Sequence, residues 1–179
     1  KPPITLPQLA VVGKSNVGKS SLINSLCNRR KLCKTSATPG KTRLINVFLI
    51  NGNFHLVDLP GYGFAKVDKK EKMRWGAMMD DYFQQSTYLR HVLHLVDIRH
   101  EATPLDVHMI NFLRESGLPF AVVLTKADKL SKQQIMKQTA AIRKQLQLPK
   151  DVPFLATSAE KGTGIDDLRK LINEAVQAR

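Results

Sequence analysis

Cysteine is scarce in this sequence, and so are the features that define several whole classes of proteins. The two cysteines, Cys27 and Cys33, are too few for a disulfide framework, and their spacing matches neither a C-x-x-C redox motif nor a zinc site. We therefore interpret them as reduced thiols. No apolar run approaches the ~20 residues of a membrane-spanning helix, and the first residues, 1–4, do not open a signal peptide. The sequence predicts a cytoplasmic protein without a membrane span.

Acidic and aromatic residues are also few. The chain has 15 acids against 28 lysines and arginines, a net charge of +13, and aromatics make up only 6%. One basic stretch, from Arg29 to Arg43, contains no acid, and a second, from Lys126 to Lys150, contains only Asp128. This excess predicts an acidic partner, nucleic acid or anionic membrane, with a generally solvated basic surface as the alternative. Because aromatics are sparse in both stretches, the pattern favours contact with the phosphates of structured RNA over base stacking.

What the sequence does contain is a regular alternation of apolar and amphipathic segments. Its 179 residues, 42% of them hydrophobic, suit one domain, residues 1–179, without repeats or linkers. We expect strands at 8–12, 44–50, 54–57, 92–96, 119–124 and 152–156, and helices at 19–27, 70–85, 105–115, 131–146 and 165–176. Asn51-Gly52 predicts a hairpin, and 30–42 reads as a polar loop. The pattern predicts an α/β fold: a mostly parallel six-stranded sheet, one antiparallel edge strand and helices on both faces.

The strongest motif runs from Gly13 to Ser20 and matches G-x-x-x-x-G-K-[ST], the phosphate-binding P-loop. Its glycines let the backbone wrap closely around a polyphosphate, and the following helix N-terminus favours negative charge. Lys19 is expected to reach the β- and γ-phosphates, and the Ser20 hydroxyl to bind Mg²⁺. The motif follows an apolar strand and opens a helix, as it does in nucleotide-binding proteins. The predicted phosphate-binding residues are Gly13, Lys14, Ser15, Asn16, Val17, Gly18, Lys19, Ser20 and Ser21.

A second motif, Thr125-Lys126-Ala127-Asp128, follows the strand expected at 119–124 and points to guanine. Guanine presents two donors on one edge, and the Asp128 carboxylate can accept both at once. Adenine presents an acceptor there instead, so it is disfavoured. The stem of Lys126 can lie over the purine ring. Thr157-Ser158-Ala159 ends the next strand, where a backbone N–H could contact the guanine oxygen, although this last motif is weak alone.

A third group of residues is expected around the γ-phosphate and Mg²⁺. Asp58-Leu59-Pro60-Gly61 follows a strand; Asp58 can hold Mg²⁺ through water, and the Gly61 N–H can touch the γ-phosphate. In the preceding loop Thr38 and Thr42 are both candidates to complete the Mg²⁺ shell when GTP is bound, and we favour Thr42. Tyr62 follows Gly61 where Ras-like proteins have a glutamine that orients the attacking water. We therefore expect slow intrinsic hydrolysis.

Together these motifs resemble the EngB family, also called YihA or YsxC, among the TrmE-Era-EngA-EngB-Septin-like bacterial-type GTPases. The resemblance runs from Gln8 onward and includes Gly13–Ser21, Thr38–Thr42, Asp58-Leu59-Pro60-Gly61-Tyr62-Gly63, Trp75, Asp97-Ile98-Arg99 and Thr125–Asp128. Lys14 departs from the arginine usual in the family's P-loop. The resemblance implies a Ras-like P-loop NTPase fold, GTP hydrolysis with Lys19, Thr42 and Gly61 in catalytic roles, and nucleotide contacts from Gly40, Lys41, Thr42, Arg43 and Leu44.

The resemblance also implies cofactors and partners. Thr42 would be the switch ligand of Mg²⁺, and Asn16 matches a position that helps related GTPases hold K⁺, with a loop-shaping role as the alternative. The expected function is a monomeric switch in assembly of the large ribosomal subunit, in contact with rRNA and ribosomal proteins, and needed for normal cell division. A protein-interaction factor acting directly at the division septum is the alternative.

Some residues are expected to be structural. Met73, Met78 and Met79 are expected to pack in a helix interface, and Trp75 to be a core or docking aromatic. His91, His94, His100 and His108 show no metal-binding spacing, so we assign them no chemistry.

Overall fold

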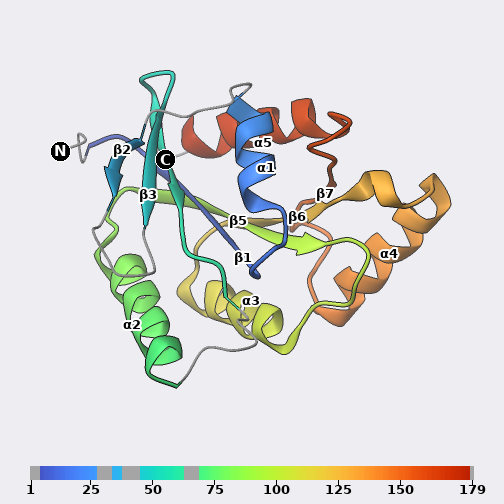
Figure 1. Ribbon diagram of the computed structural model, residues 1–179, viewed down its shortest axis with the longest axis horizontal. Coiled ribbons are helices and arrows are strands. Elements are labelled where there is room, and N and C mark those ends of the chain that lie inside the picture. Colours follow the sequence, from blue (N-terminus) through green and yellow to red (C-terminus); the bar gives the residue numbers. More distant parts are fainter. Residues whose placement is uncertain (1–4, 28–33, 38–44, 63–68, 178–179) are drawn as a thin grey trace.

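The computed structural model describes residues 5–27, 34–37, 45–62 and 69–177, which form one mixed sheet covered by helices on both faces (Figure 1). The strands are β1 (Gln8–Gly13), β2 (Lys34–Ala37), β3 (Asn46–Ile50), β4 (Phe54–Asp58), β5 (Leu89–Asp97), β6 (Phe120–Thr125) and β7 (Phe154–Ala156). The helices are α1 (Lys19–Cys27), α2 (Lys69–Gln85), α3 (Pro104–Ser116), α4 (Lys132–Gln145) and α5 (Ile165–Gln177), with a short 3-10 turn, η1, at Ala127–Lys129.

The sheet has the order β2-β3-β4-β1-β5-β6-β7. Strands β4, β1, β5, β6 and β7 are parallel to one another, and β3 is antiparallel to β4, so the predicted α/β class is confirmed. The sheet has one strand more than the six expected. This strand, β2, lies within the segment predicted as a loop and pairs antiparallel with β3. Lys34–Ala37 has no apolar alternation that would mark a strand, and its pairing with β3 supplies the structure that the local sequence does not.

Two hydrophobic cores lie on opposite faces of the sheet. Neighbouring residues of β1 alternate between them: Ala10 and Val12 belong to the core beneath α2, α3 and α4, and Leu9 and Val11 to the core beneath α1 and α5. The parallel strands are therefore apolar on both faces, which explains why they read as continuous hydrophobic runs in the sequence.

Local sequence signals account for several element ends. Ser131 caps α4 with a capping box that includes Gln134, as its N-cap assignment predicts, and Thr103 forms the same motif with Asp106 at α3. The predicted hairpin turn is present, and Asn51 (φ 50°) and Gly52 (φ 69°) both adopt the left-handed conformation that such a turn requires.

The parallel strands bring the predicted motifs together. The residues after β1, β4, β5, β6 and β7 all emerge at the carboxyl edge of the sheet, where ligands bind in open α/β folds. These are the segments that hold the P-loop, Asp58–Gly61, Asp97–Arg99, Thr125–Asp128 and Thr157–Ala159. Of the described helices, none combines the length and the apolar character needed to cross a membrane.

Candidate nucleotide-binding site

The P-loop connects the end of β1 to the first turn of α1, as its motif predicts. Two residues in it, Asn16 (φ 67°) and Gly18 (φ 101°), have left-handed backbones. Gly13 is needed for space, because a Cβ there would lie 3.1 Å from Val17 Cγ1 and 3.2 Å from Leu95 Cβ. The loop thus uses one glycine for close packing and one for conformation, and both keep the backbone compact at the start of α1.

A cavity of about 590 Å³ opens over this loop. Its walls combine the P-loop, the segment after β4 and one residue of β3: Lys14, Ser15, Asn16, Val17, Gly18, Lys19, Ser20, Ser21, Asn46, Asp58, Leu59, Pro60 and Gly61. Two segments 40 residues apart in the sequence, both predicted to contact phosphates or Mg²⁺, therefore face the same space. Gly13 lies just behind the wall.

Lys19 points across this cavity toward the end of β4. Its ammonium group donates hydrogen bonds to the Asp58 carboxylate and to the Leu59 carbonyl oxygen. The residue predicted to bind phosphates and the residue predicted to hold Mg²⁺ are therefore in direct contact, and each balances the charge of the other.

Asn46 is a wall residue that the sequence did not single out. It is the cross-strand partner of Asp58 in the β3–β4 pair, and its Oδ1 is buried with no hydrogen-bond partner in the described part of the chain. A buried polar atom without a partner is rare in native proteins. No motif includes Asn46, so only the strand register reveals that it lies beside Asp58.

The donor atoms in this cavity suit a hard divalent cation. The Ser20 hydroxyl, the Asp58 carboxylate and the Asn46 side-chain oxygen are the type of ligand that Mg²⁺ prefers. Within the described residues, no three His, Cys, Asp or Glu side chains cluster into a metal cage of their own. This matches the way Mg²⁺ sits in nucleotide sites, held by one or two side chains and by phosphates. The predicted ligand Thr42, its alternative Thr38, and Gly40, Lys41, Arg43 and Leu44 lie outside the described residues.

The Asp58–Gly61 segment continues past β4 and lies directly against the P-loop. The Ser15 N–H donates to the Tyr62 carbonyl oxygen at 2.6 Å, and the Tyr62 N–H donates to the Gly13 carbonyl oxygen at 3.2 Å. A Cβ on Gly61 would lie 3.1 Å from Ser15 Cα and 3.2 Å from Ser15 N. Because both of these atoms are backbone, glycine is the residue that fits at this position.

The side chain of Tyr62 points away from the cavity and into the core. Its hydroxyl lies 2.6 Å from His94 Nε2 on β5 and donates to Asp106 Oδ1 on α3 at 2.5 Å. The other oxygen of Asp106 accepts the Thr103 N–H at 2.8 Å, which closes the capping box of α3. The residue at the position of the water-orienting glutamine is thus anchored in the interior, and its phenol is held away from the cavity.

The protonation states in this network follow from its geometry. Burial lowers the pKa of His94 to about 4 against the opposing charge of Asp106, so the imidazole is neutral at physiological pH. Burial and the neighbouring Asp106 carboxylate raise the pKa of Tyr62 above its usual range. The single Tyr62 proton goes to Asp106, so His94 donates from Nε2, and its buried Nδ1 is left without a partner among the described residues.

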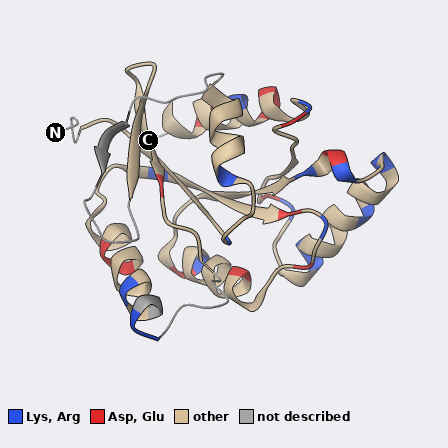
Figure 2. Ribbon diagram, viewed as in Figure 1, with Lys and Arg blue, Asp and Glu red and all other residues tan. Residues whose placement is uncertain are grey.

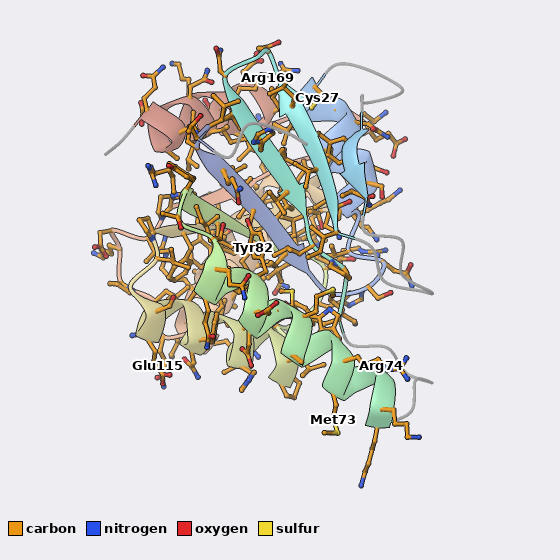
Figure 3. The ribbon with its side chains drawn as sticks, turned by 90° about the vertical axis from the view of Figure 1, so that its left-hand side faces the viewer. Cys27, Met73, Arg74, Tyr82, Glu115 and Arg169 are labelled. Atoms are coloured by element: carbon orange, nitrogen blue, oxygen red, sulfur yellow. The ribbon has the colours of Figure 1, made fainter. Side chains whose placement is uncertain are left out.

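Trp75 connects the same segment to α2. Its indole N–H donates to the Pro60 carbonyl oxygen at 3.0 Å, and its ring meets the Tyr62 ring edge-on, with centroids 5.5 Å apart. Trp75 is therefore a packing aromatic, as expected. Met79 on the same helix is buried, but the expectation for Met73 is wrong: it is 73% exposed and points away from the molecule beside Arg74 (Figure 3). Met73 lies on the solvent side of α2, which the sequence spacing alone did not distinguish.

A second cavity, of about 280 Å³, adjoins the first. Its lining residues are Gly18, Ser21, Leu22, Arg99, Thr125, Lys126, Asp128, Lys129, Thr157, Ala159 and Glu160. Gly18 and Ser21 line both cavities, so the space over the P-loop continues into the space beside Thr125–Asp128. Phosphates in the first cavity and a purine in the second would match the layout of one nucleotide.

Asp128, in the turn after β6, is oriented by the segment that follows β7. The Ser158 hydroxyl donates to Asp128 Oδ1 at 2.9 Å, and this bond lowers the pKa of Asp128, which keeps the carboxylate ionised. The Ala127 N–H donates to the Thr157 carbonyl oxygen at 2.9 Å. Ser158 and Ala127 were both predicted as nucleotide-binding residues. They do not line the second cavity, but their hydrogen bonds connect the two segments that form its wall.

Lys126 lines the second cavity and reaches the P-loop. Its ammonium group donates to the Asn16 carbonyl oxygen at 3.2 Å and lies 3.4 Å from Asp97 Oδ2, and its stem passes above Gly18. Burial raises the pKa of Asp97, but hydrogen bonds from Arg99 and the charges of Arg99 and Lys126 outweigh it and bring the pKa to about 2. The Asp97-Ile98-Arg99 motif thus provides the anion that fixes Lys126.

Comparison with known proteins agrees with this geometry. The family described as 50S ribosome-binding GTPase matches residues 8–126, and the elongation factor Tu GTP binding domain matches residues 78–178. Probable GTP-binding protein EngB of Syntrophomonas wolfei subsp. wolfei is 50% identical over 94% of this chain and 86% of its own length. The corresponding protein of Clostridium perfringens (strain SM101 / Type A) is 52% identical over 93% of this chain and 85% of its own length.

Solved structures of GTP-binding proteins also match this chain. A crystal structure of a probable GTP-binding protein EngB superposes with a TM-score of 0.79 at 26% identity, over 96% of this chain and all (100%) of that one. Era in complex with MgGDPNP and nucleotides 1506–1542 of 16S ribosomal RNA has a TM-score of 0.67 at 26% identity, over 95% of this chain and 56% of Era.

The fold, the P-loop and these matches define a P-loop GTPase, an enzyme that hydrolyses GTP and whose class uses a divalent metal, typically Mg²⁺. Within that class, the chain belongs to the EngB family of GTP-binding proteins. The family that the sequence motifs resemble is therefore confirmed.

Proposed function

We propose that this protein, a single G domain over residues 1–179, is a monomeric cytoplasmic switch that acts in assembly of the large ribosomal subunit. The matching family is described as ribosome-binding, and a structural relative, Era, has been crystallised with ribosomal RNA. The observation that carries the proposal is the hydrogen bond from Trp75 to Pro60. It connects the segment expected to sense the γ-phosphate to a helix with a basic, exposed end.

The cavity walls support the roles proposed for Lys19, Ser20, Asp58 and Gly61, whereas the role of Thr42 is proposed from the sequence alone. Lys19 leaves Asp58 to bind the β- and γ-phosphates, and Ser20, Thr42 and, through water, Asp58 hold Mg²⁺. Mg²⁺ held by these residues would supply positive charge that neutralises the charge developing on the phosphates. The Gly61 N–H contacts the γ-phosphate. Asp128 and the Thr157–Ala159 backbone read guanine in the second cavity.

The start of α2 is the proposed output surface. Lys69, Lys70 and Arg74 are exposed there, next to the exposed Met73 (Figure 3). Any shift of Pro60 on GTP binding acts on Trp75, and through it on this end of the helix. GTP and GDP would therefore present this surface differently to rRNA or ribosomal proteins.

Cosedimentation with purified large ribosomal subunits tests the switch. At low salt we expect binding with a non-hydrolysable GTP analogue and binding at least several-fold weaker with GDP. Equal binding in both nucleotide states, or binding in neither, would refute the proposal. We place effects on cell division downstream of faulty ribosomes, so the subunit assay and not septal localisation is the deciding measurement.

Hydrolysis in K⁺ and Na⁺ buffers tests the roles of Asn16 and Tyr62. We expect fewer than about one turnover per second without a partner, because no glutamine orients water, and a faster rate in K⁺. Asn16→Gly deletes the side chain but keeps the left-handed backbone, φ 67°, that glycine adopts freely. The variant is expected to lose the K⁺ effect. Equal rates of the unmodified protein in both buffers would remove K⁺ from the proposal.

A further inference from the structure

Among the described helices, α4 has the largest net positive charge, because the four basic residues of α2 are offset by three acids. This helix contains Lys132, Lys137, Arg143 and Lys144 and no acidic residue. By contrast, α3 contains one arginine against two acids, and α5 two basic residues against three acids. Figure 2 shows α4 in blue and tan without red along its length. The excess charge of the chain is therefore not spread evenly over its surface.

All three lysines of α4, Lys132, Lys137 and Lys144, are exposed. Lys137 and Lys144 lie on the side of the helix opposite to Ile135 and Ile142, which face the core. Lys137 and Lys144 are two helical turns apart on one face, a separation of about 10 Å at the backbone. Ala140, between them, is also exposed. We call Lys132, Met136, Lys137, Ala140 and Lys144 the α4 surface.

The lysines of the α4 surface have no ion-pair partner among the described residues, although lysines elsewhere do: Lys126 pairs with Asp97 and Lys129 with Asp128. Arg143 has a structural task, since it donates to the Pro149 carbonyl oxygen at 2.6 Å and lies 4.1 Å over the Phe154 ring. The charges of the α4 surface therefore remain available to a partner. If these lysines neutralised RNA phosphates, the counterions condensed on the RNA would be released.

The helix is attached to parts of the fold other than the phosphate cavity. Gln138 donates to the Ile98 carbonyl oxygen at 2.8 Å, and the Gln145 amide exchanges two hydrogen bonds of 2.9 Å with the Ala102 backbone. Both partners lie on the connection from β5 to α3. These contacts fix α4 to the connection that follows β5, whereas α2 is hydrogen-bonded to Pro60 in the wall of the phosphate cavity.

We propose that the α4 surface binds the phosphate backbone of structured RNA in the same way in every nucleotide state. It would act as a constant anchor beside the nucleotide-dependent contacts of α2. The surface has no aromatic side chain on which bases could stack, so it suits recognition of a folded RNA by shape and charge. The inference rests on the proposed function only for the source of that RNA, the large subunit.

The test uses a labelled RNA hairpin with a stem of about 16 base pairs, the span of a typical double-stranded-RNA domain. The variant Lys137→Gln/Lys144→Gln removes two charges from the α4 surface. The control Lys170→Glu lowers the net charge by the same amount, but at an exposed position of α5 on the other side of the sheet. GDP affinity and the thermal midpoint, measured for all three proteins, verify that the fold is intact.

We expect the double variant to bind the hairpin on the order of tenfold more weakly at about 0.1 M salt. The slope of log affinity against log salt is expected to fall by about two, one for each lost phosphate contact. The control is expected to stay within twofold of the unmodified protein. The loss should be the same with GDP and with a GTP analogue.

Other results would overturn the inference. Equal losses in the double variant and the control would mean a diffuse effect of net charge. A loss seen with large subunits but not with the hairpin would assign the α4 surface to a protein partner, and a loss in one nucleotide state only would refute the constant anchor. The hairpin assay does not depend on subunit binding. The α4 inference can therefore hold if the switch proposal fails, and it can fail if the switch proposal holds.

Discussion

Replacing Asp128 with alanine is expected to weaken GTP and GDP binding by at least about 100-fold and to abolish the preference for guanine over adenine. Two hydrogen bonds to a charged acceptor are lost, each contributing about 1.5–3 kcal/mol, so the expected loss is at least about 3 kcal/mol. Asp128 lines the second cavity, and the hydrogen bond from Ser158 holds its carboxylate in place. Calorimetric titration with GDP, GTP and ATP measures both effects.

Ser158→Ala is the matched control for this substitution. It keeps the carboxylate and removes only the hydroxyl that donates to Asp128 Oδ1 at 2.9 Å. We expect a smaller loss than for Asp128→Ala, with guanine preference retained, because only one hydrogen bond to the carboxylate, about 1.5–3 kcal/mol, is removed and the carboxylate still accepts both guanine donors. If Asp128→Ala bound GDP as tightly as the unmodified protein, the assignment of guanine recognition to this residue would be wrong.

Gly164→Ala is expected to destabilise the fold by more than about 3 kcal/mol. Gly164 has a left-handed backbone, φ 73°, and an added Cβ would lie 2.2 Å from the Ala156 carbonyl oxygen. The left-handed conformation alone costs about 1–2 kcal/mol for a residue with a Cβ, and the clash with β7 backbone adds to it. Since Ala156 leads directly into Thr157 and Ser158, GDP affinity is expected to fall with stability.

Gly162→Ala separates these two contributions. Gly162 has a similar φ of 79°, but an added Cβ there meets no atom within 4 Å. We expect a loss of about 1–2 kcal/mol from conformation alone. Urea denaturation followed by circular dichroism compares the two variants. Similar midpoints for both would show that the contact between Gly164 and β7 is less tight than the structure indicates.

Patterns of hydrophobicity were sufficient to predict most of the fold. The apolar runs at 92–96 and 119–124 correspond to β5 and β6, because strands buried on both faces need apolar side chains throughout. The helix at 19–27 and the Ser131 cap depend on local signals and were predicted correctly. β2 could not be predicted in this way, since Lys34–Ala37 becomes a strand only by pairing with β3.

The site residues also fall into two groups, those that the sequence predicts and those that only the structure reveals. The P-loop, Asp58–Gly61 and Thr125–Asp128 are continuous motifs, so their residues could be named from sequence, and the structure brings them around two joined cavities. Asn46, His94 and Asp106 belong to no motif, and their contacts with Asp58 and Tyr62 depend on strand register and helix packing. Such partners become visible only once the strands and helices are placed.

The position of the Tyr62 side chain determines how the segment beside it can rearrange. The phenol occupies a closed slot in which it supplies the hydrogen bonds of His94 Nε2 and Asp106 Oδ1. Partial withdrawal would leave both groups buried and unpaired, at a cost of about 1–3 kcal/mol each or more for a charged group. Withdrawal of the phenol from this slot is thus disfavoured. Gly61 is consequently expected to shift only as far as an anchored Tyr62 allows.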